Sequence, residues 1–181
     1  MKDILKTYRP ALVFISKFIG FYLVLNTAYG LFIRYYDPHV DPVTLQVSAH
    51  VTNFLGLFYD SVTYNVEPGS LHVPLMLGQS TVVNVFEGCN GLNVMIVYAC
   101  FLFAFRGTPK QTIFFFTGGI VVIYLMNLLR VVALFEVAMK YPSYLYLVHK
   151  YVFTGFIYTV VFAMWFIWIK TVGKREHQTA L

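Results

Sequence analysis

Charged residues are scarce in this chain. Only 12% of its 181 residues are Asp, Glu, Lys or Arg, whereas 59% are hydrophobic. A soluble domain carries roughly 25% charged residues, so this composition excludes an ordinary water-soluble globular domain. The long apolar runs instead predict a bilayer protein whose length allows a single domain.

Cysteine is almost absent, and the motifs that bind metals or nucleic acids are missing. The two cysteines, Cys89 and Cys100, form no CxxC pair, and no HExxH motif occurs. A disulfide, a redox motif, a metal site and a cofactor are therefore not expected. The net charge of +5 does not predict nucleic-acid binding, because the basic residues are scattered at segment ends and form no stripe. No internal repeat or pair of broken helices suggests a transporter.

Four apolar segments predict an all-α integral membrane protein with about four transmembrane helices. They cover residues 11–33, 92–105, 112–135 and 151–169. The first is longer than the roughly 7–15 apolar residues of a cleaved leader and has no A-x-A site, so we interpret it as a retained anchor. We divide the chain into an anchor helix (1–34), an extracytoplasmic region (35–88), and a three-helix membrane core with a cytoplasmic tail (89–181).

The extracytoplasmic region is expected to hold one helix and a small sheet. Residues 43–59 look amphipathic, and Gln46, His50 and Asn53 make them a poor spanning helix and a better interfacial one. Whether this helix lies on the membrane or crosses it stays open. Residues 61–66, 71–73 and 81–85 are strand-like and predict an antiparallel sheet.

Basic residues set the orientation. With the N-terminus in the cytoplasm and four spans, eight basic residues fall inside and four outside, which follows the positive-inside rule. The inner residues are Lys2, Lys6, Arg9, Arg106, Lys110, Lys170, Lys174 and Arg175, and the outer ones are Arg34, Arg130, Lys140 and Lys150.

Three chemically capable residues then reach the same outer boundary. At 1.5 Å per residue, Arg130 lies about 30 Å above Lys110, His149 about 31 Å above Lys170, and Cys89 about 25 Å above Arg106. The hydrocarbon core is about 30 Å thick. We therefore expect Cys89, Arg130 and His149 to meet at the outer face of the membrane.

Each of these residues also has a plainer interpretation. Cys89 is flanked by residues that suit a turn opening a helix, where the helix dipole is expected to lower its pKa, whereas Cys100 lies mid-span and is assigned to packing. Arg130 could only reach toward lipid phosphates, yet its apolar neighbours and nearby Asn127 favour an inward position, with both side chains directing donors at an oxyanion. A single histidine at a membrane interface, such as His149, is more often passive than catalytic. We consider His149 catalytic only because Cys89 and Arg130 are expected at the same level.

The motifs that carry these residues resemble those of the exosortase/archaeosortase family. Residues 87–91 (Glu-Gly-Cys-Asn-Gly) are similar to its cysteine motif, residues 127–130 (Asn-Leu-Leu-Arg) to its N-x-x-R motif, and His149 to its downstream histidine. The resemblance covers about residues 83–170 and is strongest to the compact F-type exosortases. Asn90 stands where many members have serine, and the chain has fewer spans than typical members, which leaves substrate choice open.

The resemblance implies a cysteine peptidase, or a transpeptidase, in the bacterial inner membrane with its site facing the periplasm. Its partner would be an exported protein with a C-terminal sorting signal, made of a short motif, a transmembrane helix and a basic tail. Membrane lipid would surround the site, and no nucleic acid is expected. The acceptor stays open between water and an amine linked to a lipid or glycan.

In the enzymatic interpretation, Cys89 is the nucleophile, His149 the general base and Arg130 the oxyanion donor. The site is expected to be supported by Asn127, Glu87 and Asn90. The alternative is a non-catalytic membrane subunit or scaffold, in which Arg130 forms an ion pair with Glu87 and Cys89 only packs. Iodoacetamide separates the two, because an exposed thiol of low pKa reacts near neutral pH.

Overall fold

The structure is a computed structural model that describes residues 2–67, 69–105 and 107–178. Arg106, counted above among the inner basic residues, lies outside the described residues. The elements in chain order are helices α1 (Lys2–Tyr36) and α2 (Pro42–Leu55), strands β1 (Val62–Tyr64), β2 (His72–Leu77) and β3 (Ser80–Phe86), the 3₁₀ helix η1 (Glu87–Cys89), α3 (Leu92–Ala104), α4 (Pro109–Lys140), the 3₁₀ helix η2 (Pro142–Tyr144), α5 (Leu145–Leu147), the π-helix η3 (Val148–Val152) and α6 (Phe153–Gln178).

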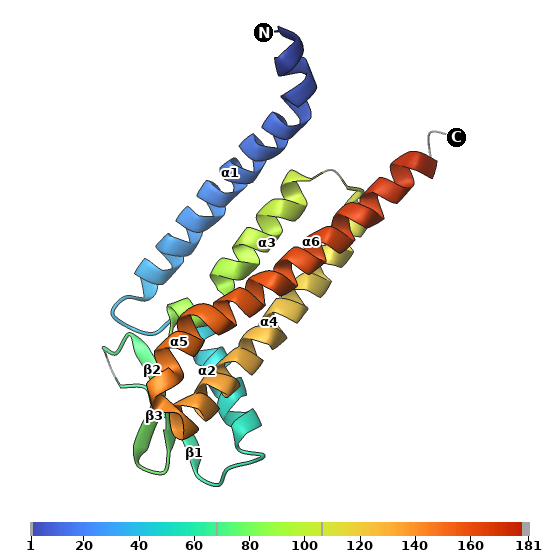
Figure 1. Ribbon diagram of the computed structural model, residues 1–181. Coiled ribbons are helices and arrows are strands. Elements are labelled where there is room, and N and C mark those ends of the chain that lie inside the picture. The colour runs from blue at the N-terminus through green and yellow to red at the C-terminus, as the bar shows by residue number, and fades with distance from the viewer. Residues whose placement is uncertain (1, 68, 106, 179–181) are drawn as a thin grey trace.

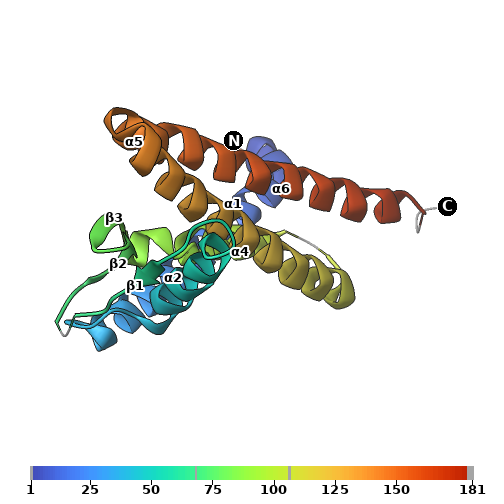
Figure 2. The same cartoon turned by 90° about the horizontal axis from the view of Figure 1, so that it is seen from below.

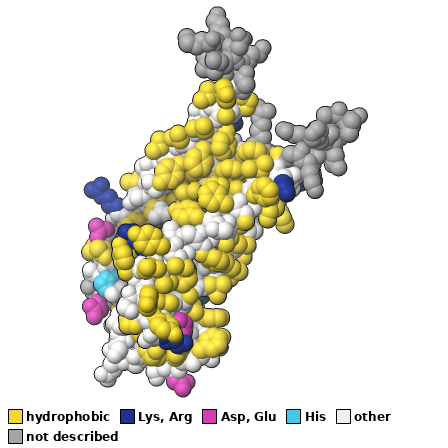
Figure 3. Space-filling model, viewed as in Figure 1, with side chains coloured by type: hydrophobic (Ala, Val, Ile, Leu, Met, Phe, Trp, Pro, Cys, Tyr) yellow, Lys and Arg dark blue, Asp and Glu magenta, His cyan; other side chains and the backbone are white. Residues whose placement is uncertain are grey.

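Four helices run lengthwise through the molecule, and the remaining elements gather at one end. Both termini lie at the same end of the bundle, while α2, the sheet and α5 lie at the opposite end (Figure 1). Seen along the perpendicular direction, α4 and α6 diverge from their common end at α5 (Figure 2). Hydrophobic side chains cover most of the helical part in Figure 3, and charged side chains collect mainly near the end that holds the sheet.

Three helices are long and apolar enough to cross a membrane: Tyr8–Tyr36, Pro109–Lys140 and Pro142–Val172. The expected fourth span, residues 92–105, has nearly the predicted length but is too short to cross the hydrocarbon core. Helix α3 has 13 residues, or about 20 Å of rise, against a hydrocarbon core of about 30 Å. It is short because residues 87–91 form a turn before it and Phe105 is extended after it. The protein is mostly helical with several apolar helices, but four full-length spans are not confirmed.

The lengthwise helices pack through aromatic side chains and one close approach. Phe14 of α1 lies edge-on to Phe101 of α3, with ring centroids 5.4 Å apart. Between α3 and α4, a Cβ on Gly119 would come within 2.2 Å of the Tyr98 ring. Glycine is therefore required there, and Tyr98 reaches across to donate a hydrogen bond to the Phe115 carbonyl at 2.8 Å.

Helix α2 packs inside the end of the molecule that holds the sheet. Its start is set by Asp41, whose side chain accepts hydrogen bonds from the backbone of Val43 and Thr44, with proline at the first helical position. It ends at Leu55 rather than at residue 59. Val47 and Val51 have no exposed surface and belong to a core shared with the sheet and α4. The apolar face that suggested an interfacial helix is thus buried against protein.

The sheet has the order β1-β2-β3 with antiparallel pairing, and all three predicted strands are present. Strand β2 runs further than residue 73, through Pro74, because the carbonyl of Pro74 still accepts a hydrogen bond from the N–H of Asn65 at 3.3 Å. Strand β3 is an edge strand, and the chain leaves it directly into η1 and Cys89.

Candidate active site

A tight turn carries Cys89 between the sheet and helix α3. Gly91 has a φ of +83°, and a Cβ there would lie 3.1 Å from the side chain of Asn127, so glycine is needed both for the backbone and for the space. The side-chain oxygen of Asn90 accepts a hydrogen bond from the N–H of Leu92 at 2.9 Å and starts α3. Residues 87–91 therefore form a bend that places the Cys89 thiol between the sheet and α3.

Side chains from three other elements hold this turn. Asn127 of α4 donates from Nδ2 to the carbonyl of Cys89 at 2.7 Å. Asn90 donates from Nδ2 to Thr44 Oγ1 of α2 at 3.3 Å, and the hydroxyl of Tyr29 in α1 donates to the carbonyl of Glu87 at 3.3 Å. The position of the thiol is thus tied to α1, α2 and α4 at once.

Two of these partners were missed from the sequence. Thr44 is fully buried and also donates from its hydroxyl to the carboxylate of Asp41, which links the start of α2 to the cysteine turn. The Asp41-Pro42 pair is a helix-start signal, and it could have located this end of α2. Nothing in the sequence around Tyr29 distinguishes it from the other tyrosines of an apolar segment.

His149 stands opposite the thiol and lies in the π-helix η3. Its Nε2 is 3.7 Å from Cys89 Sγ and 3.4 Å from Nη2 of Arg130. A guanidinium only donates hydrogen bonds, so we assign the lone pair to Nε2 and the proton of the neutral ring to Nδ1. The single lone pair of Nε2 then faces both the Arg130 N–H and the Cys89 thiol, and it accepts the thiol proton when the contact with Arg130 is released.

Arg130 reaches the same point from α4 and keeps spare donor capacity. Its Nε is buried without a hydrogen-bond partner. Arg130 and Glu87 are both described, and they form no ion pair; the pair found in the described part of the chain joins Lys140 and Glu136 at 2.7 Å. Asn127 does not direct its amide at an oxyanion, as the sequence predicts. Its amide nitrogen is instead hydrogen-bonded to the Cys89 carbonyl.

The pKa of the Cys89 thiol is shifted in the direction opposite to the expected one. Only 4% of this residue is exposed, and burial raises the pKa of its thiol, although the positive charge of Arg130 acts to lower it. The expectation of a lowered pKa was wrong, because Cys89 lies in the separate helix η1 before α3 and burial outweighs the favourable charges. The thiol is therefore neutral at pH 7 and needs a base.

This environment predicts slow alkylation at neutral pH. In a Cys100→Ala background, where Cys89 is the remaining thiol, the rate with iodoacetamide should be low at pH 7 and rise about tenfold per pH unit toward pH 9, because only the thiolate reacts. Arg130→Met, which removes the charge that lowers the pKa, should slow the reaction further at each pH. Mass spectrometry of the alkylated chain measures both rates. Fast, pH-independent labelling between pH 6 and 7 would contradict the raised pKa.

A cavity of about 440 Å³ opens beside the thiol. Cys89 and His149 lie in its wall, together with Val131 and Leu134 of α4, Leu145 and Tyr146 of the α5 region, and residues 81–85 of β3. Most of the lining is apolar, and the side chains of Cys89 and His149 are among the polar groups that face this space.

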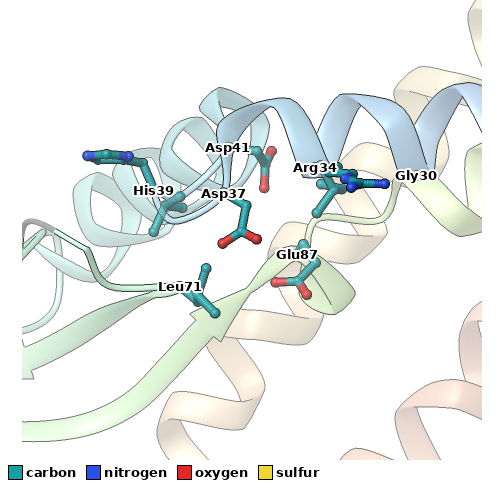
Figure 4. Close-up of a pocket in the computed structure, with 9 residues that line it drawn as sticks. Gly30, Arg34, Asp37, His39, Asp41, Leu71 and Glu87 are labelled. Atoms are coloured by element: carbon teal, nitrogen blue, oxygen red, sulfur yellow. The ribbon is translucent and has the colours of Figure 1, made fainter.

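A second cavity of about 280 Å³ lies on the other side of η1. The carboxylates of Asp37 and Glu87 point into it, whereas the ring of His39 is directed away (Figure 4). Glu87 is thus turned from the thiol toward this acidic cavity. In the part of the chain that the structure describes, no three His, Cys, Asp or Glu side chains are grouped to hold a metal ion. The side chain of His177 lies outside the described part.

Comparison with known proteins gives one family. The family model described as "Transmembrane exosortase (Exosortase_EpsH)" matches residues 5–170. Comparison with curated proteins and with solved structures finds no match. The matched range contains the cysteine turn, both residues contributed by α4, and the histidine of η3.

Proposed function

The chain belongs to the transmembrane exosortase family, and from this membership and the site geometry we propose that it is a membrane-embedded cysteine peptidase and transpeptidase. Its substrates are exported proteins with a C-terminal sorting signal, cut at the outer face of the bacterial inner membrane. The observation that carries the proposal is the meeting of Cys89 Sγ and Arg130 Nη2 at one nitrogen of His149, at 3.7 and 3.4 Å.

Acylation begins at the neutral thiol. Nε2 of His149 takes the proton of Cys89 as the sulfur attacks the scissile carbonyl carbon. The carbonyl oxygen becomes an oxyanion, and we assign the guanidinium of Arg130, whose Nη2 lies 3.4 Å from His149 Nε2, as its hydrogen-bond donor. The C–N bond then breaks, His149 returns the proton to the leaving amine, and the sorting helix departs with that amine while the exported protein stays on sulfur as a thioester.

Deacylation uses the same residues, with the proton transfers in the reverse order. A water molecule, or an amine of a lipid- or glycan-linked acceptor, attacks the thioester carbon while His149 accepts its proton. The C–S bond breaks, and the proton passes to the sulfur to restore the thiol. Asn127 acts through the backbone of Cys89, and Asn90 acts through the turn, so we assign both as positioning residues.

Hydroxylamine tests the thioester directly. Added to membranes that are processing substrate, it should compete with the natural acceptor and leave a hydroxamate at the new C-terminus, because it attacks thioesters readily. Mass spectrometry of the processed protein detects the hydroxamate. If the processed protein carries only a free carboxylate at every hydroxylamine concentration, a covalent intermediate on Cys89 is contradicted.

One observation favours the alternative of a non-catalytic membrane subunit. Cys89 is buried, and its pKa is raised, as for a packing cysteine. Packing alone, however, does not require a histidine at the sulfur and an arginine at that histidine. The Arg130–Glu87 ion pair of that alternative also does not form between these two described residues.

The orientation makes a separate prediction. The N-terminus, the C-terminus and the loop between α3 and α4 should be cytoplasmic, and the region from Tyr35 to Cys89 periplasmic, because basic residues concentrate on the inner side. A phosphatase reporter fused after Lys174 should be inactive, and one inserted between β1 and β2 should be active. An active reporter after Lys174 would reverse the orientation and remove the periplasmic site.

A further inference from the structure

The free edge of β3 offers backbone groups that no other strand uses. The Pro74 carbonyl of β2 points toward β1, where it accepts from Asn65. Asn84 of β3 stands opposite Pro74. In an antiparallel ladder, the backbone groups of such a pair point away from each other. The N–H and carbonyl of Asn84 therefore point out of the sheet, while Val83 and Val85 bond to β2.

The cavity beside the thiol follows this edge. A cavity on one face of a strand meets every second residue, because side chains alternate between faces. Here five consecutive residues of β3, residues 81–85, line the space. Val131 and Leu134 of α4 and Tyr146 form the opposite wall. The cavity is thus a slot between a strand edge and a helical wall.

The slot leads to the nucleophile. Phe86 has the same orientation as Asn84 along β3, and Cys89, which lines the same cavity, follows Phe86 by three residues. A chain that pairs with Asn84 would therefore continue past Phe86 and bring its next carbonyl to the sulfur. Cys89 and His149 close this end of the slot.

The direction of a bound chain follows from the fold. Strand β3 runs from the end farthest from the termini toward the lengthwise helices (Figure 1). In a substrate whose scissile bond precedes its transmembrane helix, the residues before that bond run in the same direction, from outside toward the bilayer. A substrate in the slot is therefore parallel to β3.

We propose that the substrate binds by adding a parallel strand to the free edge of β3, with the N–H of Asn84 donating to a substrate carbonyl and the carbonyl of Asn84 accepting from a substrate N–H. This inference rests on the proposed peptidase function. It assigns the segment just before the scissile bond to the slot and makes its main chain, rather than particular side chains, the shared element of recognition.

Peptide electrophiles of two lengths test the pairing. Acetyl-tetra-alanyl chloromethyl ketone carries the residues that precede a scissile bond, and acetyl-alanyl chloromethyl ketone lacks all but one. In the Cys100→Ala protein, the longer reagent should alkylate Cys89 on the order of tenfold faster, because its main chain can form strand hydrogen bonds that the shorter reagent lacks. Iodoacetamide, which needs no slot, reports the intrinsic reactivity of the thiol.

Variants of Asn84 and of the reagent locate the effect on the backbone. Asn84→Pro removes the outward N–H without touching the ladder to β2, and it should reduce the ratio of the two rates to near one. Asn84→Ala keeps the N–H and should keep the ratio. Tetra-alanyl reagents N-methylated at successive positions should lose the advantage at one position, and they test the wild-type slot even if Asn84→Pro misfolds.

The outcomes separate this inference from the proposed function. Normal iodoacetamide labelling with no advantage for the longer peptide, or an advantage that survives both Asn84→Pro and every N-methylation, overturns the strand pairing and leaves the peptidase standing. Equal rates for the tetra-alanyl reagent and a linear alkyl chloromethyl ketone of similar length would make the slot an acyl-chain site. A Cys89 that is inert to every reagent up to pH 9 counts against the peptidase itself.

Discussion

Cells in which Cys89→Ala replaces the wild-type chain should retain the C-terminal helix on every substrate. The nucleophile has no substitute, because the other cysteine lies within α3 and the turn offers no second thiol. The loss should be complete rather than partial, since the whole reaction proceeds through the thioester. Removal of one buried sulfur costs about 1 kcal/mol of folding free energy, so the variant should still insert and fold.

Cys100→Ala is the matched control for this experiment. Cys100 is fully buried, so the same substitution removes the same atom from a similarly packed place. No side-chain hydrogen bond to it is found among the described residues. Its variant should process substrates normally. Surface proteomics of the two strains, with membrane levels of each variant measured in parallel, gives the comparison; full processing by Cys89→Ala would end the peptidase proposal.

Arg130→Lys should lower the processing rate by roughly 100-fold, the loss typical of one oxyanion donor. Lysine keeps the positive charge near His149. It lacks the planar fork of donors that places Nη2 3.4 Å from His149 Nε2 and leaves further N–H groups on the same guanidinium. The rate of helix removal in isolated membranes, at saturating and limiting substrate, measures the effect.

The control for this variant is Arg34→Lys. Arg34 is exposed in the last turn of α1 and lines the acidic cavity on the other side of η1. The same substitution there should leave the rate unchanged. Near-normal processing by Arg130→Lys would reduce Arg130 to a counter-charge that lowers the Cys89 pKa, and in that case raising the pH should restore what little activity is lost.

The sequence by itself determined the class of protein and the depth of its reactive groups. Composition and apolar runs are sufficient to predict a helical membrane protein, because bilayer thickness fixes how many apolar residues a span needs. The rise of a helix converts residue numbers into depth, and Cys89, Arg130 and His149 accordingly lie at one level. Their meeting within 3.4–3.7 Å depends further on the rotation of each helix about its axis.

Only the tertiary structure decided what surrounds these groups. Burial of Cys89, and with it the raised pKa, comes from packing by residues remote in sequence. The bond from Asn127 to the Cys89 backbone and the slot along β3 arise in the same way. Depth in a membrane is a one-dimensional quantity that residue spacing can supply, whereas burial, hydrogen-bond partners and cavities are set by contacts between segments, which spacing does not contain.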